Sequence, residues 1–261
     1  MRVLFFVPGG AKAQLDALPL AAQVADGLAA QLQVACPAAM APLWKLLPAV
    51  EKILPFGFDA AVSLADWTNL LGCVREPDFQ ACLNLATNWR LDLLLSLSHI
   101  PVRVASAGFS ATSIISSADL LDFLAPLGLS PNPKPFQLKL PAKALAKAQA
   151  EFPQGNGPLL LLAPGGGSDD WPQSQWDALP NGVQQHLPQA RICGFSGLNL
   201  INQAAQVASA DVLVSSNPVA SRLAALTGVT LVDLEQLRGD QPLNQLNQKS
   251  VFKALGFATA A

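Results

Sequence analysis

The chain has 261 residues, of which 51% are hydrophobic and 13% are charged, and its formal net charge is −2. This composition excludes a disordered chain, and the absence of a basic block excludes the charge pattern of a nucleic-acid-binding protein. The longest uninterrupted apolar runs, such as Leu159–Ala163, are far shorter than the roughly 18 residues that a membrane-spanning helix needs. We therefore expect one large or two modest globular domains with no integral membrane segment.

The first apolar stretch, Val3–Val7, is shorter than the roughly 7–15 residues of a signal peptide and predicts a buried first strand. The four cysteines are scattered without a CxxC pair, and the chain has only two histidines. Neither a disulfide framework nor a zinc site is expected from this pattern. We expect a protein of the reducing cytoplasm that uses no metal and no cofactor.

Short apolar runs alternate with stretches of helical periodicity, which is typical of βαβ units around a parallel sheet. In the first half we predict strands at Arg2–Val7, Leu32–Cys36, Lys52–Phe56, Asp92–Leu97 and Val102–Ala105. Helices are predicted at Ala13–Ala30, Leu43–Leu47, Ala65–Cys73, Asp78–Trp89 and Ser117–Leu124.

The segment Pro126–Pro141 holds five prolines and shows no helical period, which predicts an interdomain linker. Beyond it we predict strands at Pro158–Ala163, Ala190–Cys193, Asp211–Ser215 and Val229–Val232. Helices are predicted at Gln173–Gln185, Asn199–Ala208, Pro218–Thr227 and Ser250–Phe257. We assign residues 1–130 to a first Rossmann-like domain, 131–141 to the linker and 142–261 to a second Rossmann-like domain.

Both halves open in the same way, with a strand followed by Pro8-Gly9-Gly10 or by Pro164-Gly165-Gly166-Gly167. Glycine allows a positive φ and a close backbone approach, and the next helix directs free N–H groups and a positive dipole end toward an anion. Neither loop matches GxGxxG or GxxxxGK[ST], which argues against a standard dinucleotide site or P-loop. The glycines can equally serve only to form tight strand-to-helix turns.

Three segments together resemble the lipopolysaccharide heptosyltransferases of glycosyltransferase family 9. They are MRVLFFVPGGAKAQLDALPLAAQVADGL with the later LLPAVEKILPF, LLLLAPGGGSDDWPQSQWDAL, and ADVLVSSNPVASRLAALTGVTLVDL. The resemblance covers most of the chain and implies an α/β fold of the GT-B type, in which two Rossmann-like domains face each other across a cleft. It also implies that the second domain binds a nucleotide-sugar donor and that the first binds the acceptor.

The first loop departs from the family pattern. Alignment on Leu18-Pro19 puts Lys12-Ala13 where the family has Gly-Asp, so the Asp proposed as general base is absent. Asp16, one helical turn further along, is the candidate catalytic base, and Gly9, Gly10 and Lys12 form the candidate acceptor-side loop. A solvated Asp that favours the helix dipole is the plainer interpretation of Asp16.

The donor side departs as well. Asp169 and Asp170 stand where the family has a Lys before Trp, and they either repel a phosphate or cap the helix at Pro172. The family's Asp-Thr-Gly-Pro-Met-His falls on residues 217–222, where Asn217 can cap the helix, the N–H groups of residues 219–221 can face an anion, and Arg222 replaces the His. The candidate donor-binding residues are Gly165, Gly166, Gly167, Ser168, Asn217, Ser221 and Arg222.

Two functions stay open. The first is a metal-independent glycosyltransferase that moves a sugar from a nucleotide-sugar donor to a glycan or lipopolysaccharide acceptor, in the cytoplasm or peripherally at the inner face of the membrane. The second is a catalytically inactive GT-B scaffold that binds a protein partner or ligand. The joint loss of the family's Asp, Lys and His favours the second.

Overall fold

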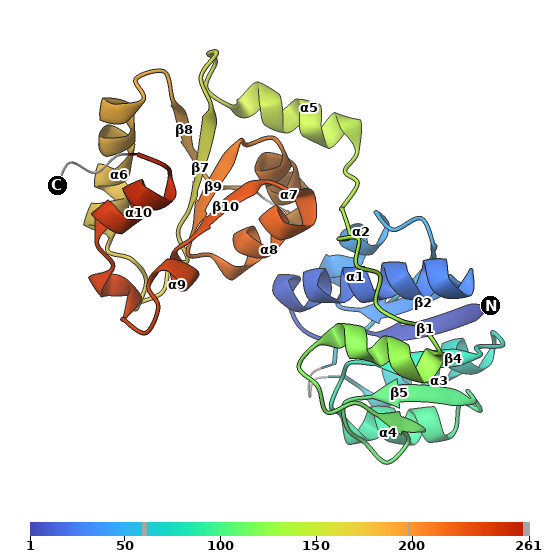
Figure 1. Cartoon of the computed structure of the whole chain (residues 1–261). Helices are drawn as coiled ribbons and strands as arrows, with labels where there is room; N and C mark the ends of the chain where they lie inside the picture. The colour runs from blue at the N-terminus through green and yellow to red at the C-terminus, as the bar shows by residue number, and fades with distance from the viewer. Residues whose placement is uncertain (59–61, 198, 258–261) are drawn as a thin grey trace. The chain divides into compact units, whose positions relative to one another are not determined.

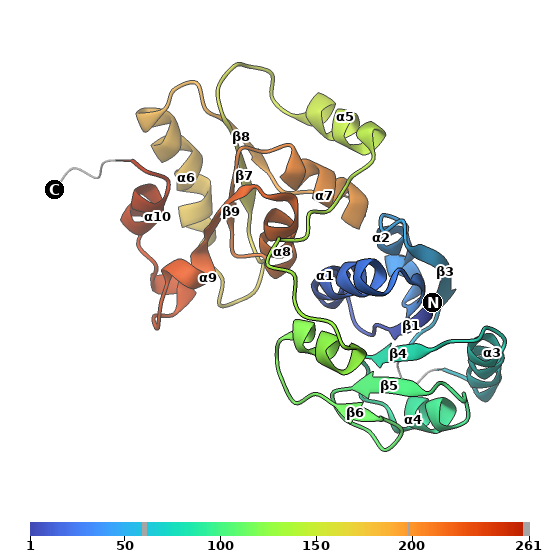
Figure 2. The same cartoon turned by 45° about the vertical axis from the view of Figure 1, so that its right-hand side comes forward.

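The computed structural model describes residues 1–58, 62–197 and 199–257, and the chain forms two compact units, Met1–Phe136 and Gln137–Ala261. Each unit contains a sheet whose strands pair in parallel, with helices between successive strands (Figures 1 and 2). The predicted α/β fold with two Rossmann-like domains is confirmed. Among the described residues, no helix has the length and apolar character needed to cross a membrane.

The first unit is built on a six-stranded sheet with the order β3-β2-β1-β4-β5-β6 in the described part of the chain. Its strands are β1 (Arg2–Phe6), β2 (Gln31–Cys36), β3 (Val50–Pro55), β4 (Ala81–Asn84), β5 (Val102–Ala105) and β6 (Ser113–Ile114). Its helices are α1 (Ala11–Leu28), α2 (Ala41–Trp44), α3 (Leu64–Arg75) and α4 (Trp89–Ser96), with 3-10 turns η1 (Ala38–Met40) and η2 (Leu120–Leu127).

Both faces of this sheet are covered, so its central strands read as continuous apolar runs. Leu4 and Phe6 of β1 share a core with Trp67 of α3 and Leu94 of α4. Side chains alternate along a strand, so Val3 and Phe5 of β1 face the opposite side, where α1 and η2 pack together. The unit is therefore a three-layer sandwich.

The second unit has a four-stranded sheet with the order β10-β9-β7-β8. Its strands are β7 (Leu159–Ala163), β8 (Arg191–Gly194), β9 (Val212–Ser215) and β10 (Thr230–Asp233). Its helices are α5 (Ala142–Glu151), α6 (Gln173–His186), α7 (Leu200–Ala208), α8 (Pro218–Thr227), α9 (Leu234–Leu237) and α10 (Gln248–Ala254), with the 3-10 turn η3 (Leu243–Gln245). Figure 1 shows α6 and α10 on one face of this sheet and α7 and α8 on the other.

A pair of tryptophans lies in the core between this sheet and α6. The rings of Trp171 and Trp176 meet edge to face with their centroids 5.1 Å apart. The Trp171 indole N–H donates to the carbonyl of Leu246 at 2.8 Å, which satisfies a buried donor. Trp171 thus ties the segment before α6 to the segment before α10.

In each sheet the strand order reverses beside the first strand of the unit. The chain runs from β1 outward through β2 and β3 and returns to β4 on the other side of β1. In the second unit the reversal lies between β7 and β9. Open parallel sheets bind ligands at the carboxyl ends of the strands at such a reversal, so the loops after β1 and after β7 are the expected ligand-binding loops.

Two predicted elements of the first unit are wrong. The segment Asp78–Trp89, predicted as a helix, contains β4, whose four residues are all buried and so show no alternation. The segment Asp92–Leu97, predicted as a strand, lies mostly in α4, where its leucines are divided between the core and the surface. The boundary is set by Asn88, whose side chain accepts from the Arg90 N–H at 2.9 Å and starts the helix.

Candidate functional site

A buried glutamine organises the loop after β1. Gln14, which is fully buried, donates from Nε2 to the carbonyls of Val7 at 2.9 Å, Pro8 at 3.1 Å and Gly9 at 3.1 Å. Its Oε1 accepts from the indole N–H of Trp44 at 2.7 Å. This amide therefore fixes the path of the Pro-Gly-Gly loop from beneath. Gln14 was not identified from the sequence as a functional residue.

The N-terminus of α1 is left open by this arrangement. Gly10, the N-cap residue, has no side chain to bond the first turn, and the first turn holds no acidic residue. Within the described part of the chain, the N–H groups of Ala11, Lys12 and Ala13 have no hydrogen-bond acceptor. Free N–H groups together with the positive end of the helix dipole favour an anion at this end.

The candidate base lies one turn into the same helix. The Asp16 carboxylate is partly buried, and its Oδ2 accepts from Lys12 Nζ at 2.7 Å. An ion pair of this exposed i,i+4 kind contributes little stability, so its main effect is to hold both side chains on one face of α1. Lys12 and Asp16 lie in the first turns of α1, after the Gly9-Gly10 loop that leaves β1 at the carboxyl edge of the first sheet.

The loop after β7 is held by two side chains. The Gly165 N–H donates to Ser216 Oγ at 2.8 Å, and the Gly166 N–H donates to Asp170 Oδ2 at 2.8 Å. The other carboxylate oxygen of Asp170 accepts from the Trp171 N–H at 2.7 Å. Gly166 has φ +76°, a conformation that favours glycine.

Asp170 therefore braces its own loop and does not cap the following helix. Pro172 is the N-cap residue of α6, and no side chain bonds the first turn of that helix. The predicted cap at Pro172 is wrong, because the Asp170 carboxylate turns back toward Gly166.

Two donors of this loop stay available. The backbone N–H groups of Gly167 and Ser168 have no acceptor within the residues that the structure describes, and both residues are exposed. Ser168 Oγ donates to Asp169 Oδ1 at 3.3 Å. These exposed N–H groups are the loop's own means of binding an anion.

The N-terminus of α8, in contrast, is closed. Asn217 caps it as predicted, because its Oδ1 accepts from the N–H groups of Val219 at 3.0 Å and Ala220 at 3.1 Å. The Ser221 N–H donates to the Asn217 carbonyl at 2.9 Å. The prediction that these three N–H groups face an anion is wrong, because each already has an acceptor.

A small network of hydroxyls supports Asn217. Ser215, which is fully buried, accepts at Oγ from the Asn217 N–H at 2.9 Å and from Ser221 Oγ at 3.1 Å. Its own hydroxyl donates to the Asn217 carbonyl at 3.0 Å. Ser215 and Ser216 were not identified from the sequence, although two serines directly after a buried strand are a signal for a polar strand end.

The second unit thus brings together the residues predicted for the donor at the reversal between β7 and β9. Gly165 contacts Ser216 across the two loops, and the Asn217 amide donates to the Pro164 carbonyl at 3.4 Å. Arg222 follows Ser221 in the first turns of α8 and is partly buried. No group of three or more His, Cys, Asp or Glu side chains that could hold a metal ion exists among the described residues.

No protein-family model and no curated protein matches this sequence. Solved structures do match. A glycosyltransferase family 9 protein from Veillonella parvula DSM 2008 is 9% identical with a TM-score of 0.77, and the match covers 98% of this chain and 96% of that chain.

Two proteins of E. coli match with similar coverage. Heptosyltransferase WaaC with ADP-2-deoxy-2-fluoro heptose is 14% identical with a TM-score of 0.68, covering 98% of this chain and 99% of that one. ADP-heptose lps heptosyltransferase II is 14% identical with a TM-score of 0.67, covering 98% of each chain. The chain therefore has the fold of these glycosyltransferase family 9 and heptosyltransferase structures, with two Rossmann-like domains of the GT-B type. This confirms the fold predicted from the resemblance of the three sequence segments.

Proposed function

We propose that this protein is a glycosyltransferase that moves a sugar from a nucleotide-sugar donor to a glycan acceptor. The observation that carries the proposal is the likeness of fold, over 98% of the chain, to heptosyltransferases, two of whose structures hold ADP or an ADP-linked heptose analogue. The loops at the carboxyl edges of the two sheets contain the groups that we assign to this reaction.

We assign the donor to the second unit. A departing nucleoside diphosphate accumulates negative charge, which N–H groups and cations stabilise. The exposed N–H groups of Gly167 and Ser168, the Ser221 hydroxyl and the Arg222 guanidinium are the groups we assign to this charge. Gly165, Gly166 and Asn217 shape the two loops around it.

We assign the acceptor to the loop of the first unit formed by Gly9, Gly10 and Lys12. In the reaction the acceptor hydroxyl oxygen bonds to the anomeric carbon, the bond from that carbon to the diphosphate breaks, and the hydroxyl proton passes to the Asp16 carboxylate. Lys12 pairs with that carboxylate at 2.7 Å, so the two side chains share one face of α1. A lipopolysaccharide acceptor would suit a protein bound peripherally at the inner face of a membrane, which co-sedimentation with vesicles tests.

Nucleotide binding is the first test of the proposal. A panel of nucleoside diphosphates at a hundredfold excess over the dissociation constant should stabilise the protein by about 2.7 kcal/mol, seen as a rise in melting temperature. Arg222→Ala should weaken this binding, whereas Arg238→Ala, at a surface ion pair with Glu235, should leave it unchanged. If no nucleotide shifts the melting temperature at millimolar concentration, the donor assignment is wrong and a scaffold without catalytic activity becomes the better explanation.

A further inference from the structure

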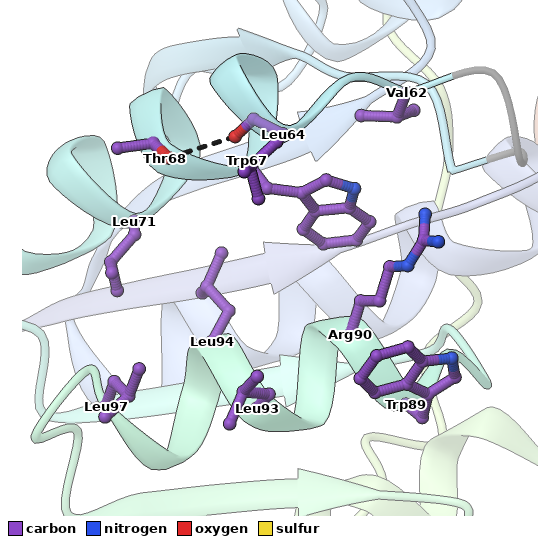
Figure 3. A pocket seen from close by; sticks show the side chains of 10 residues that line it. All are labelled: Val62, Leu64, Trp67, Thr68, Leu71, Trp89, Arg90, Leu93, Leu94 and Leu97. Atoms are coloured by element: carbon purple, nitrogen blue, oxygen red, sulfur yellow. Dashed lines mark hydrogen bonds between the residues drawn. The ribbon is translucent and has the colours of Figure 1, made fainter.

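A groove lies between α3 and α4 of the first unit, away from the loops assigned to the sugar transfer. Its volume is about 480 Å³, and Figure 3 shows the side chains that line it. Along most of its length the lining is aliphatic, with Leu71 of α3 facing Leu93, Leu94 and Leu97 of α4. Sites for small molecules typically have volumes of roughly 300–1,000 Å³ and mostly apolar walls.

The rim of this groove exposes large apolar side chains. Leu64 is 83% exposed, Trp89 is 65% exposed, and Leu93 and Leu97 are each close to half exposed at 48% and 49%. Single exposed apolar residues are ordinary, but four around one groove form a patch of the kind that marks a binding surface.

One end of the groove is polar and carries donors. Trp67 is only 8% exposed, its ring packs against Phe56 with centroids 4.9 Å apart, and its Nε1–H is buried without an acceptor among the described residues. Figure 3 shows this indole nitrogen turned toward the end of the groove where the Arg90 guanidinium and Val62 lie. A buried donor without an acceptor destabilises the fold, and a ligand atom that accepts this hydrogen bond would remove that cost.

Among the described residues that line the groove, Arg90 is the one with a charged side chain. The Arg90 guanidinium lies 5.6 Å from the centre of the Trp89 ring, and no ion pair of Arg90 occurs in the described part of the chain. The carboxylates of Asp66 and Asp92 are not among the residues that line the groove, and they accept hydrogen bonds from Ser63 and Ser110. The groove therefore combines an aliphatic trough with donors and one cation at a single end.

We propose that this groove binds a single-chain amphiphile, with its alkyl chain along the leucines and its anionic head group, a phosphate or carboxylate, on Trp67 Nε1–H and Arg90. A helix from a partner protein fits the groove less well, since a stable protein interface buries about 1,200–2,000 Å² and this trough has the dimensions of a small-molecule site. The proposal does not depend on the sugar transfer.

The test of the trough is a chain-length series on the intact protein. Hexyl, octyl and decyl phosphate are titrated by calorimetry below their micelle concentrations. Burial of each added methylene should raise the affinity about fourfold until the trough is filled. An affinity that does not change with chain length, or no binding of any of the three, would overturn the proposal.

The test of the polar end uses octyl phosphate, octanol and three variants. Arg90→Gln should lower the affinity for octyl phosphate about tenfold or more and leave the affinity for octanol unchanged, because only the phosphate pairs with the cation. Arg75→Gln, the matched control near the end of α3 outside the groove, should change neither. Trp67→Phe keeps an aromatic side chain but removes the N–H together with the five-membered ring, so it should weaken the binding of octyl phosphate more than the binding of octanol. Equal effects of Arg90→Gln and Arg75→Gln would overturn the head-group assignment.

Leu93→Asp distinguishes a bound amphiphile from two other possible occupants of the groove, a second copy of the chain and a membrane surface. Leu93 is half exposed, so this variant should keep its melting temperature and lose octyl phosphate binding. If instead the wild type sediments as a dimer that this variant dissociates, the groove is an interface between two copies. If the groove variants lose only binding to anionic vesicles, its occupant is a membrane surface. Either result would overturn the proposal.

Discussion

The N-termini of α1 and α8 follow the same strand–loop–helix pattern, yet side-chain amides close one and leave the other open. At α1, the Gln14 amide donates to three loop carbonyls and leaves the first N–H groups without acceptors. At α8, the Asn217 amide oxygen takes two of the N–H groups for itself. A Gly-rich turn, or a proline at the first position of a helix, therefore does not by itself make an anion site. The direction of the nearest amide decides which backbone groups remain for a ligand.

The largest effect is expected at the open end. Asp16→Asn should lower the transfer rate about 10²–10⁴-fold, because the acceptor hydroxyl loses the carboxylate that takes its proton. Nucleotide affinity should stay nearly unchanged, which calorimetry on the same variant measures. Asp26→Asn, an exposed position of the same helix, is the matched control. Full turnover in Asp16→Asn would show that the base lies elsewhere.

The brace beneath the open end should contribute most to stability. Gln14→Leu leaves the Trp44 N–H and three carbonyls without their partner, and burying unpaired polar groups costs about 1–3 kcal/mol for each group that water does not reach. We expect a loss of about 2–4 kcal/mol of unfolding free energy in a denaturant titration. Gln31→Leu, exposed at the start of β2, should change it by less than about 0.5 kcal/mol. Equal losses in both variants would contradict the bracing role.

Substitutions at the closed N-terminus of α8 should have smaller effects on stability. Asn217→Ala removes the cap of α8 and should cost about 1 kcal/mol, measured as a shift in the denaturant midpoint. Asn217→Asp should keep the cap but place a negative charge where the donor diphosphate is assigned, so nucleotide affinity should fall while stability holds. Asn181→Ala, on the exposed side of α6, controls for the helix and should have little effect on either. If Asn217→Asp binds nucleotide as the wild type does, the diphosphate does not lie beside α8.

The smallest effect on stability is expected at a third helix N-terminus, that of α3. At α3, Ser63 and Asp66 form a reciprocal capping box, and the hydrogen bonds from Ser63 lower the pKa of the Asp66 carboxyl below its usual value. This contribution to stability is present above the usual carboxyl pKa and is lost as the pH falls through the lowered value. The free energy of unfolding should therefore decrease slightly more between pH 6 and pH 2 for the wild type than for Asp66→Asn. Parallel curves would show that the box adds nothing measurable.

Elements with a clear period and a local start signal could be predicted from the sequence. The helix predicted at Pro218–Thr227 is α8 with the same bounds, because Asn217, Pro218 and the closing Gly228 mark both ends. In contrast, α5 follows the proline-rich segment and buries only Ala148, so it has no apolar stripe to find. The order of β4 and α4 could not be resolved because the strand is short and fully buried, while the helix has leucines on both sides.

The candidate site shows the same division. The positions of the loops at Gly9 and Gly165 follow from local residue types, and the structure places both at the carboxyl edges of their sheets. The use of each N–H group does not follow, because it depends on residues from elsewhere in the fold. Trp44 bonds Gln14 from 30 positions away, and Ser216 bonds Gly165 from 51 positions away.

The tryptophan pair of the second unit is an intrinsic spectroscopic probe. The chain has five tryptophans and no tyrosine, and Trp171 and Trp176 are the two that lie beyond residue 136. Trp171 is joined through Asp170 to the loop assigned to the donor phosphates, because the same carboxylate accepts from the Gly166 and Trp171 N–H groups. Any ligand that shifts this loop will move one ring of a coupled pair. Near-ultraviolet circular dichroism can therefore follow occupancy of the loop without a label.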